Sequence, residues 1–346
     1  MTNSQCSEDD FEDMGDDAET ESQAVVDAFL ASAGVEIEGE AASAEEPLPA
    51  GHRSGFVAVL GRPNVGKSTL VNACVGQKVS IVSRKPQTTR NRVMGIVTRP
   101  THQLIFIDTP GIHTDPAHKL NRLMIEQATS AIPDADVILF VVDVGGMPHE
   151  EDAYLAQLLR AKAEKRPVIF VLNKMDTLAI EQAEAHVKAY WALLPAYADS
   201  IPTSALEGIN IELLLNHILG FMPEGPRYYS GDQVTDQTER RIAAELVREA
   251  MLEYTHQEVP HAAAVLIDDY EMRDNGVLAV SATIWVERES QRPIVIGKGG
   301  EKLKRIASVA RLQLERFVGS QVYLNVWVKI KPKWRDDDRR LRELGF

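Results

Sequence analysis

Short apolar runs alternate with helical stretches along the chain from Phe56 onward. The runs read FVAVLG, QLIFIDTPG, VILFVVDV, PVIFVLNKMD and DSIPTSA, and amphipathic or polar sequence separates them. Strands that are apolar throughout and alternate with helices are typical of a parallel sheet buried on both faces. The pattern therefore predicts an α/β domain with a mostly parallel sheet over residues 54–222.

A segment rich in Pro and Gly ends this pattern. It reads PEGPRYYSG from Pro223 and predicts a linker over residues 223–233. Beyond it, the periodicity predicts a helix near 236–255, strands near 262–272 and 277–287, a helix opening at Gly299 and a strand near 322–331. We therefore expect a second, smaller α+β domain over residues 234–346.

The net charge of −14 is concentrated at one end of the chain. Residues 1–50 hold six Asp, nine Glu and no Lys or Arg, so they carry −15 and the other 296 residues carry +1. This composition predicts a disordered acidic tail over residues 1–50. A solubilising leader is the plainer interpretation, and competition with a nucleic acid for a basic surface is the alternative.

Cysteine use and hydropathy restrict the location. Cys6 and Cys74 make no disulfide framework, and the sequence has neither a secretory leader pattern nor an apolar run long enough to span a bilayer. These features exclude a secreted or membrane-spanning protein and leave a peripheral membrane contact open. We expect a reducing, cytoplasmic compartment.

The first apolar run leads into GRPNVGKST, in which four residues separate Gly61 from Gly66, Lys67 and Ser68. This spacing lets backbone N–H groups surround phosphates at a helix N-terminus, with the Lys reaching the β and γ oxygens and the Ser coordinating Mg²⁺. The loop predicts a nucleotide site formed by Gly61, Asn64, Val65, Gly66, Lys67, Ser68 and Thr69.

Three further motifs follow at the ends of apolar runs: DTPG, NKMD and SAL. The carboxylate of Asp108 can hold Mg²⁺ through water, and the amide of Gly111 can meet a γ-phosphate. Asp176 can accept hydrogen bonds from two guanine N–H groups, whereas adenine offers no such pair of donors. The motifs therefore predict GTP and GDP as ligands, bound also by Asp108, Thr109, Pro110, Gly111, Asn173, Lys174, Asp176, Ser204, Ala205 and Leu206.

The polar segment SRKPQTTRNR lies where a first switch loop is expected. Thr89, or alternatively Thr88, would complete a magnesium shell with Ser68 and Asp108 and would sense the γ-phosphate. Gly111 and the following IHTDPAHKLNR would form the second switch. Lys67 and Thr89 are accordingly predicted catalytic residues.

Ile112 stands where many GTPases carry a Gln that orients the attacking water. An aliphatic side chain cannot do this, so we expect slow intrinsic turnover. The combination of Ile112 and Asn64 resembles the pattern of translation-factor-related GTPases in which bound K⁺ replaces an arginine finger. One hypothesis is that Asn64 holds K⁺ and is a third catalytic residue. The other is that Asn64 is only a turn residue.

The second domain carries the basic surface. Residues 290–334 hold ten Lys or Arg and two Glu, a net charge of +8, which is typical of phosphate contact. Within them, Gly297 to Gly300 form a GXXG loop that opens a helix, the signature of a KH unit that clamps about four single-stranded nucleotides. RNA is favoured over DNA. The predicted contacts are Ile296, Gly297, Lys298, Gly299, Gly300, Lys302, Lys304 and Arg305.

Aromatic residues are scarce, and no stacking platform is evident. Trp285 and Trp327 lie in strand-like apolar runs, so both are predicted to lie in the core. The histidines show no metal-ligand spacing.

The combination of GRPNVGKSTLVNACVGQKVSIVSRKPQTTRNR, DTPGIH, NKMD and SAL with VIGKGGEKLKRI and WRDDDRRLRELGF resembles the Era family of bacterial GTPases over about residues 54–346. The resemblance implies a P-loop GTPase domain followed by a type II KH domain. It also implies binding of 16S ribosomal RNA near its 3′ end, assistance to maturation of the small (30S) subunit, and partial location at the cytoplasmic face of the membrane. The acidic extension departs from the family pattern.

Two other interpretations remain open at this stage. One is an RNA-binding scaffold that holds nucleotide but hardly hydrolyses it, which Ile112 favours. The other is a related GTPase that acts on tRNA or carries two G domains, against which the single set of nucleotide motifs argues. We expect a monomer that does not bind DNA.

Overall fold

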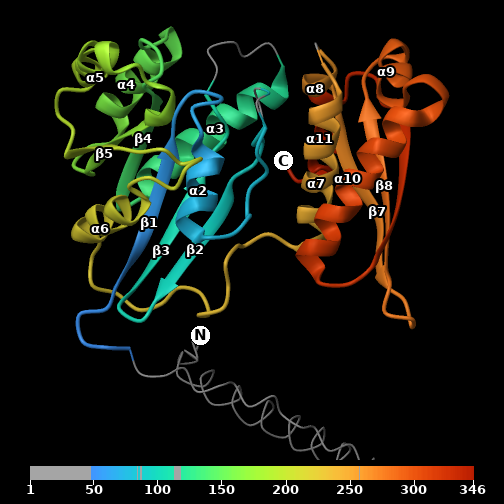
Figure 1. Cartoon of the computed structure of the whole chain (residues 1–346), viewed down its shortest axis with the longest axis horizontal. Helices are drawn as coiled ribbons and strands as arrows, with labels where there is room; N and C mark the ends of the chain where they lie inside the picture. The colour runs from blue at the N-terminus through green and yellow to red at the C-terminus, as the bar shows by residue number, and fades with distance from the viewer. Residues whose placement is uncertain (1–47, 84, 86–87, 113–117, 257) are drawn as a thin grey trace, which may run out of the picture. The chain divides into compact units, whose positions relative to one another are not determined.

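The computed structural model describes residues 48–83, 85, 88–112, 118–256 and 258–346 (Figure 1). The predicted acidic tail lies outside the described residues except for its last three positions, and parts of both predicted switch segments lie outside them too. In the described ranges, no helix is long and apolar enough to cross a membrane.

The first half of the described chain forms one sheet with the strand order β2-β3-β1-β4-β5-β6. Neighbouring strands are parallel except β2, which runs antiparallel to β3 at the edge. The predicted mostly parallel sheet is confirmed, and β2 is an addition to it. The strands are β1 (Arg53–Leu60), β2 (Val93–Arg99), β3 (His102–Asp108), β4 (Val137–Asp143), β5 (Val168–Asn173) and β6 (Asp199–Pro202).

Helices cover both faces of this sheet, which is why its central strands are apolar throughout. Val57 and Val59 of β1 pack on one face with α2 and α6, while Ala58 and Leu60 pack on the other with α3, α4 and α5. Each face therefore has its own hydrophobic core. The helices are α2 (Lys67–Val75), α3 (Lys119–Asp134), α4 (Glu150–Lys162), α5 (Ile180–Leu193) and α6 (Ile211–Phe221).

The predicted linker is bonded to the sheet of the first domain. The amide of Ser54 donates to the carbonyl of Pro223 over 3.2 Å, and the amide of Gly225 donates to the carbonyl of His52 over 3.0 Å. Further on, the amide of Ile96 in β2 donates to the carbonyl of Val234 over 2.9 Å. These backbone bonds hold residues 223–234 against the first sheet.

The second half forms a smaller sheet with the order β7-β8-β9, covered by α7 and α10. β7 and β8 make an antiparallel hairpin, whereas β8 and β9 are parallel because α9 and α10 connect them. The confirmed α+β domain comprises α7 (Glu239–Tyr254), α8 (Val259–Ala262), β7 (Ala264–Met272), β8 (Leu278–Val286), α9 (Arg292–Ile296), α10 (Glu301–Val318), β9 (Val322–Ile330) and α11 (Asp338–Glu343).

One of the two predicted core tryptophans is not in the core. Trp285 is buried at 2 % exposure, but Trp327 is 57 % exposed on β9. Val326 faces the helices that cover the sheet, so the alternation of side chains along a strand turns Trp327 to the opposite face. The prediction was wrong because an apolar run does not say whether one or both faces of its sheet are covered.

Candidate nucleotide and RNA sites

The phosphate loop joins the end of β1 to the start of α2, and its glycines are required by close approaches. A Cβ on Gly61 would lie 2.5 Å from the carbonyl oxygen of Val141. Gly66 has φ +98°, and a Cβ there would lie 2.3 Å from Nδ2 of Asn173. Because side chains are excluded at both positions, the loop backbone can surround a phosphate.

Lys67 lies at the first position of α2 and is 6 % exposed. Its Nζ donates to the carbonyl oxygens of Gly61 and Arg62, each over 3.0 Å, so the amine spans the loop. Burial lowers the pKa of Lys67 to about 8, and the charge of Asp108 offsets part of this effect. An anionic phosphate would restore the charged form.

Ser68, Thr89 and Asp108 come together although they are far apart in the sequence. The Oγ1 atom of Thr89 lies 2.8 Å from Oγ of Ser68 and 3.4 Å from Oδ2 of Asp108. Asp108 is buried, and among the described residues its Oδ1 atom has no hydrogen-bond partner. Burial raises the pKa of this carboxyl, and hydrogen bonding to Ser68 and the charge of Lys67 lower it. Hydroxyl and carboxylate oxygens with an unused lone pair suit Mg²⁺.

The alternative residue, Thr88, points elsewhere. Its Oγ1 atom donates to the carbonyl oxygen of Lys85 over 2.7 Å, within the same loop. Of the two threonines, Thr89 is therefore the one with geometry suited to a metal.

One pocket is lined by the phosphate loop, residues 81–83, residues 88–89 and Gly111. The Thr109 hydroxyl donates to the carbonyl of Val59 over 2.7 Å, which ties the DTPG motif to β1. Ile112 is 1 % exposed and packs in the sheet core with Leu60. Its side chain therefore provides no polar contact beside the pocket.

The base-side motifs converge at the ends of β5 and β6. Asn173 donates from Nδ2 to the carbonyl of Val65 over 2.7 Å and accepts from the amide of Ala205 over 3.0 Å. Ser204 donates to Oδ1 of Asp176 over 2.5 Å, which orients an exposed carboxylate. Leu206 is 76 % exposed beside it. The geometry brings the predicted base contacts together.

Sequence reasoning missed Asp143, which closes β4. Its Oδ2 atom lies 2.6 Å from Nζ of Lys174, and Lys174 itself has φ +65°. The ion pair fixes the amine of Lys174 beside the end of β4. A signal was present, because Asp143 ends an apolar run in the same way as Asp108 and Asn173 do.

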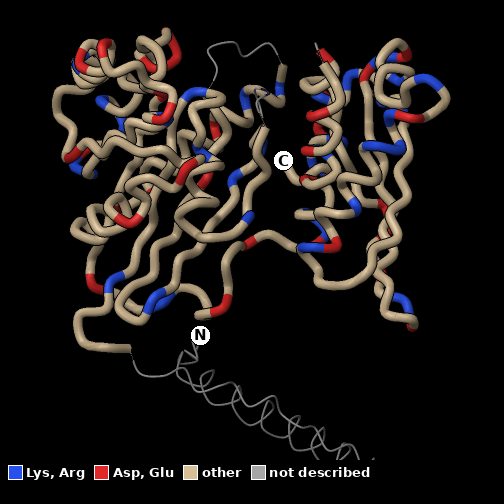
Figure 2. Tube along the Cα trace, in the orientation of Figure 1, with Lys and Arg blue, Asp and Glu red and all other residues tan. Residues whose placement is uncertain are grey.

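In the second domain, residues 297–300 form the turn between α9 and α10. Gly299 has φ +59° and Gly300 has φ +82°, and a Cβ on either would meet no atom within 4 Å. Most of the predicted contacts are accessible: exposed are Lys298, Gly299, Lys304 and Arg305, and partly exposed are Ile296 and Lys302. Figure 2 shows further Lys and Arg residues along these elements. The turn offers bare backbone and positive charge to an approaching chain of phosphates.

Two family profiles match the chain. The profile described as a 50S ribosome-binding GTPase matches residues 56–174, and a KH domain profile matches residues 258–335. These ranges contain the phosphate loop and the 297–300 turn, respectively.

The curated relatives and solved structures share both domains. The chain is 45 % identical over 294 residues to GTPase Era of Heliobacterium modesticaldum and to that of Clostridium botulinum strain Hall, covering 85 % of this chain and 97 % and 98 % of theirs. The crystal structure of Era in complex with MgGDPNP and nucleotides 1506–1542 of 16S ribosomal RNA has a TM-score of 0.80 and 38 % identity, covering 85 % of this chain and 99 % of that one. A variant of Aquifex aeolicus Era bound to GDP·AlF4⁻ has the same scores and coverage.

Proposed function

Because this chain belongs to the Era family of GTPases, we propose that its KH domain binds single-stranded 16S ribosomal RNA near the 3′ end, in a manner set by the nucleotide in the G domain. The observation that carries the proposal is the exposed, glycine-rich and basic turn of residues 297–300. The proposal is supported by the match to a solved Era complex with 16S RNA, which covers 85 % of this chain and 99 % of the Era chain.

Within the G domain, each group has a proposed task. Lys67 and the loop amides would hold the β- and γ-phosphates, and Asp176 would select guanine. Ser68, Thr89 and Asp108 would hold Mg²⁺, which supplies charge neutralisation of the phosphate oxygens when bound. Thr89 would keep its place only while a γ-phosphate is present, so its loop would report the state of the nucleotide.

Hydrolysis is proposed to be slow without a further activator. The side chain of Ile112 is buried in the sheet core, where it cannot orient water. We infer that K⁺ held near Asn64 supplies positive charge instead. The scaffold interpretation, in which nucleotide is bound and scarcely turned over, rests on the same buried isoleucine.

We also infer a role in maturation of the small ribosomal subunit, as a monomer. Peripheral contact with the cytoplasmic face of the membrane stays a prediction. So do the domain limits of 54–222 and 234–346.

Crosslinking in cells, followed by sequencing of the bound RNA, tests the proposed target. A double variant, Lys298→Asp with Gly299→Asp, places carboxylates where phosphates would lie, and Asp tolerates the positive φ of Gly299 better than most residues. Gly276→Asp, at a glycine with φ +76° in the turn between β7 and β8, controls for backbone strain. We expect reads from the 3′ end of 16S RNA, lost in the double variant and kept in the control. Reads from another RNA would contradict the proposal.

A further inference from the structure

Three consecutive residues, 88 to 90, connect the predicted magnesium site to the C-terminal domain. The side chain of Thr89 lies at that site, beside Ser68 and Asp108. The carbonyl of the preceding Thr88 accepts a hydrogen bond from Nη2 of Arg248 in α7. The following residue, Arg90, sends its guanidinium into the C-terminal domain. The threonine is thus held from both sides by the domain that carries the KH turn.

The guanidinium of Arg90 is anchored by backbone carbonyls at and just after α8. Nη1 donates to Ala263 over 2.7 Å, and Nη2 donates to Pro260 over 2.9 Å and to His261 over 3.2 Å. The group also lies over the ring of Trp334, 5.7 Å from its centroid. Arg90 is only 4 % exposed. A buried guanidinium is costly unless its donors are bonded, and Nε of Arg90 has no hydrogen-bond partner among the described residues, so loss of the Nη1 and Nη2 bonds would be unfavourable.

The same loop has further ties to the end of α7. The amide of Val82 donates to Oε1 of Glu249 over 2.8 Å. Nζ of Lys85 donates to the carbonyl of Thr255. Both contacts join the part of the loop before Thr89 to the C-terminal domain. Arg90 joins the part after Thr89 to the same domain.

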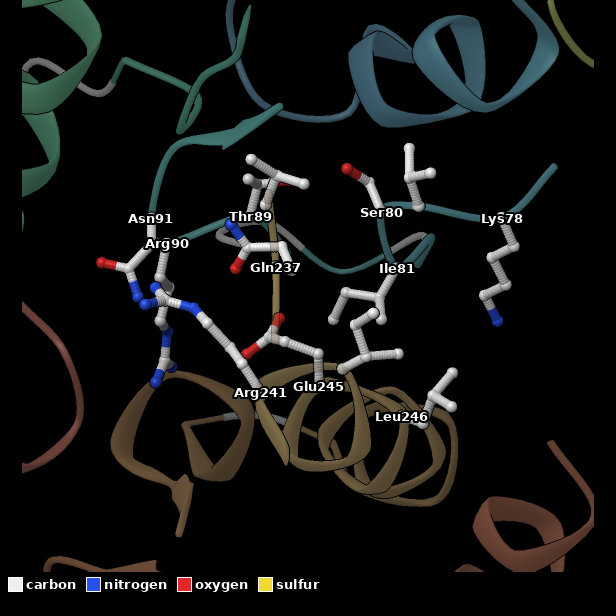
Figure 3. A pocket seen from close by; sticks show the side chains of 13 residues that line it. Lys78, Ser80, Ile81, Thr89, Arg90, Asn91, Gln237, Arg241, Glu245 and Leu246 are labelled. Carbon is white, nitrogen blue, oxygen red and sulfur yellow. The ribbon is translucent and has the colours of Figure 1, made fainter. Parts of the chain in front are cut away.

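Between these ties lies a pocket that both the loop and α7 line (Figure 3). Arg241, Glu245 and Leu246 rise from α7 toward the segment that carries Ile81 and Thr89. Ile81 of the loop is 6 % exposed and packs with Ile242 and Leu246 of α7. The polar contacts that hold the rest of the loop include those of Arg90 and Arg248, whose side chains are both buried.

We propose that Arg90 is the positioning residue that couples the nucleotide site to the RNA site, an inference that rests on the proposed function. Its hydrogen bonds tolerate little displacement, because N–H···O bonds keep to distances of about 2.7–3.2 Å and weaken steeply when the donor angle falls below about 120°. A shift of Thr89 when the nucleotide changes therefore moves α8 and Trp334, or breaks these bonds. A shift of the C-terminal domain when RNA binds acts on Thr89 by the same route, because coupling between two sites is reciprocal.

A thermodynamic cycle tests the role of Arg90. The affinity for an RNA with the sequence of nucleotides 1506–1542 of 16S RNA is measured with GDPNP and with GDP, for the full chain and for Arg90→Gln. Arg92→Gln is the matched control, because Arg92 lies two residues along and faces Asp134 of the first domain, 3.9 Å away. We expect the wild type and the control to show an affinity ratio of about 5 or more between the two nucleotides. In Arg90→Gln we expect the ratio of RNA affinities to fall to within about twofold of one. The affinity of this variant for GDP itself should be unchanged.

The outcomes separate this inference from the one on which it rests. A wild-type ratio retained in Arg90→Gln overturns the coupling role and leaves the proposed function standing, even if that variant melts at a lower temperature. A wild-type ratio of one overturns the proposed function and this inference with it. If Arg90→Gln does not fold, hydrogen exchange of the wild type decides. Exchange at residues 259–263 must then differ between GDPNP and GDP, and an identical pattern overturns the coupling role.

Discussion

Asn173 donates from Nδ2 to the carbonyl oxygen of Val65 over 2.7 Å, and this bond joins the base side of the nucleotide site to its phosphate side. The side-chain oxygen of Asn173 accepts from the amide of Ala205 at the same time. One buried amide thus fixes the ends of β1, β5 and β6 relative to one another. An amide side chain can donate to one loop and accept from the other, whereas an ionised carboxylate can only accept.

Asn173→Asp removes the donor and places a carboxylate oxygen against the carbonyl of Val65. An unsatisfied buried carbonyl costs about 1–3 kcal/mol, so we expect GDP affinity to fall by about 10-fold or more. Asn210→Asp is the control, because the side-chain amide of Asn210 also donates to a carbonyl, that of Pro202 over 2.8 Å, but at an exposed position. Calorimetric titration with GDP measures both. Equal losses in the two variants would contradict a special role for Asn173.

Asp176→Asn changes which base the site accepts. Guanine presents two donors that suit a carboxylate, whereas xanthine presents an acceptor in place of one of them, which suits an amide. A mismatched buried polar pair costs about 1–3 kcal/mol, so GTP affinity should fall by about 10- to 100-fold and XTP affinity should rise. Competition between labelled GDP and XTP measures the change. Asp199→Asn, at a carboxylate bonded to His217, should have no effect. Unaltered guanine preference would remove Asp176 from the base site.

The pKa of Lys67, about 8, predicts proton uptake on nucleotide binding. Because burial favours the neutral amine, a growing fraction of Lys67 is uncharged as the pH rises through 8. Phosphates raise the pKa again, so GDP binding at pH 8.5 should take up a fraction of a proton, and affinity should weaken above pH 8. Titration in two buffers of different ionisation enthalpy measures the uptake. Equal heats in both buffers, after correction, would rule out this role of Lys67.

Turnover should depend on the monovalent cation if K⁺ acts at Asn64. We expect single-turnover hydrolysis to be at least about 10-fold faster in K⁺ than in Na⁺, at saturating Mg²⁺, a difference of about 1.4 kcal/mol in the barrier. Asn64→Gly keeps the backbone conformation, since Asn64 has φ +63°, and should abolish the difference. Equal rates in the two salts would dismiss the hypothesis.

The sequence was sufficient for features that depend on local pattern. The fully apolar strands predicted the parallel sheet. The motifs at their ends predicted the nucleotide site, because residues at the carboxyl ends of parallel strands lie together at one edge of the sheet. β2 was not predicted, since VMGIVTR is only partly buried at the edge of the sheet. Trp327 was misassigned because periodicity does not reveal which face of a sheet is covered.

The contacts that Arg90 and Arg248 make with distant parts of the chain could not be predicted from the sequence. Arg90 looks like one more basic residue in a polar loop, and its partners at residues 260–263 are backbone carbonyls, which any sequence supplies. Arg248 is likewise one charge on an amphipathic helix. Their burial, at 4 % and 2 % exposure, is a property of the folded chain alone.

The affinity of the full chain for RNA of nucleotides 1506–1542, measured side by side with GDPNP and with GDP at one fixed salt concentration, tests the central claim most directly. The account predicts tighter binding with one nucleotide than with the other, by about 5-fold or more, abolished by Lys298→Asp with Gly299→Asp. Equal affinity with both nucleotides, or binding unaffected by the double variant, would contradict it.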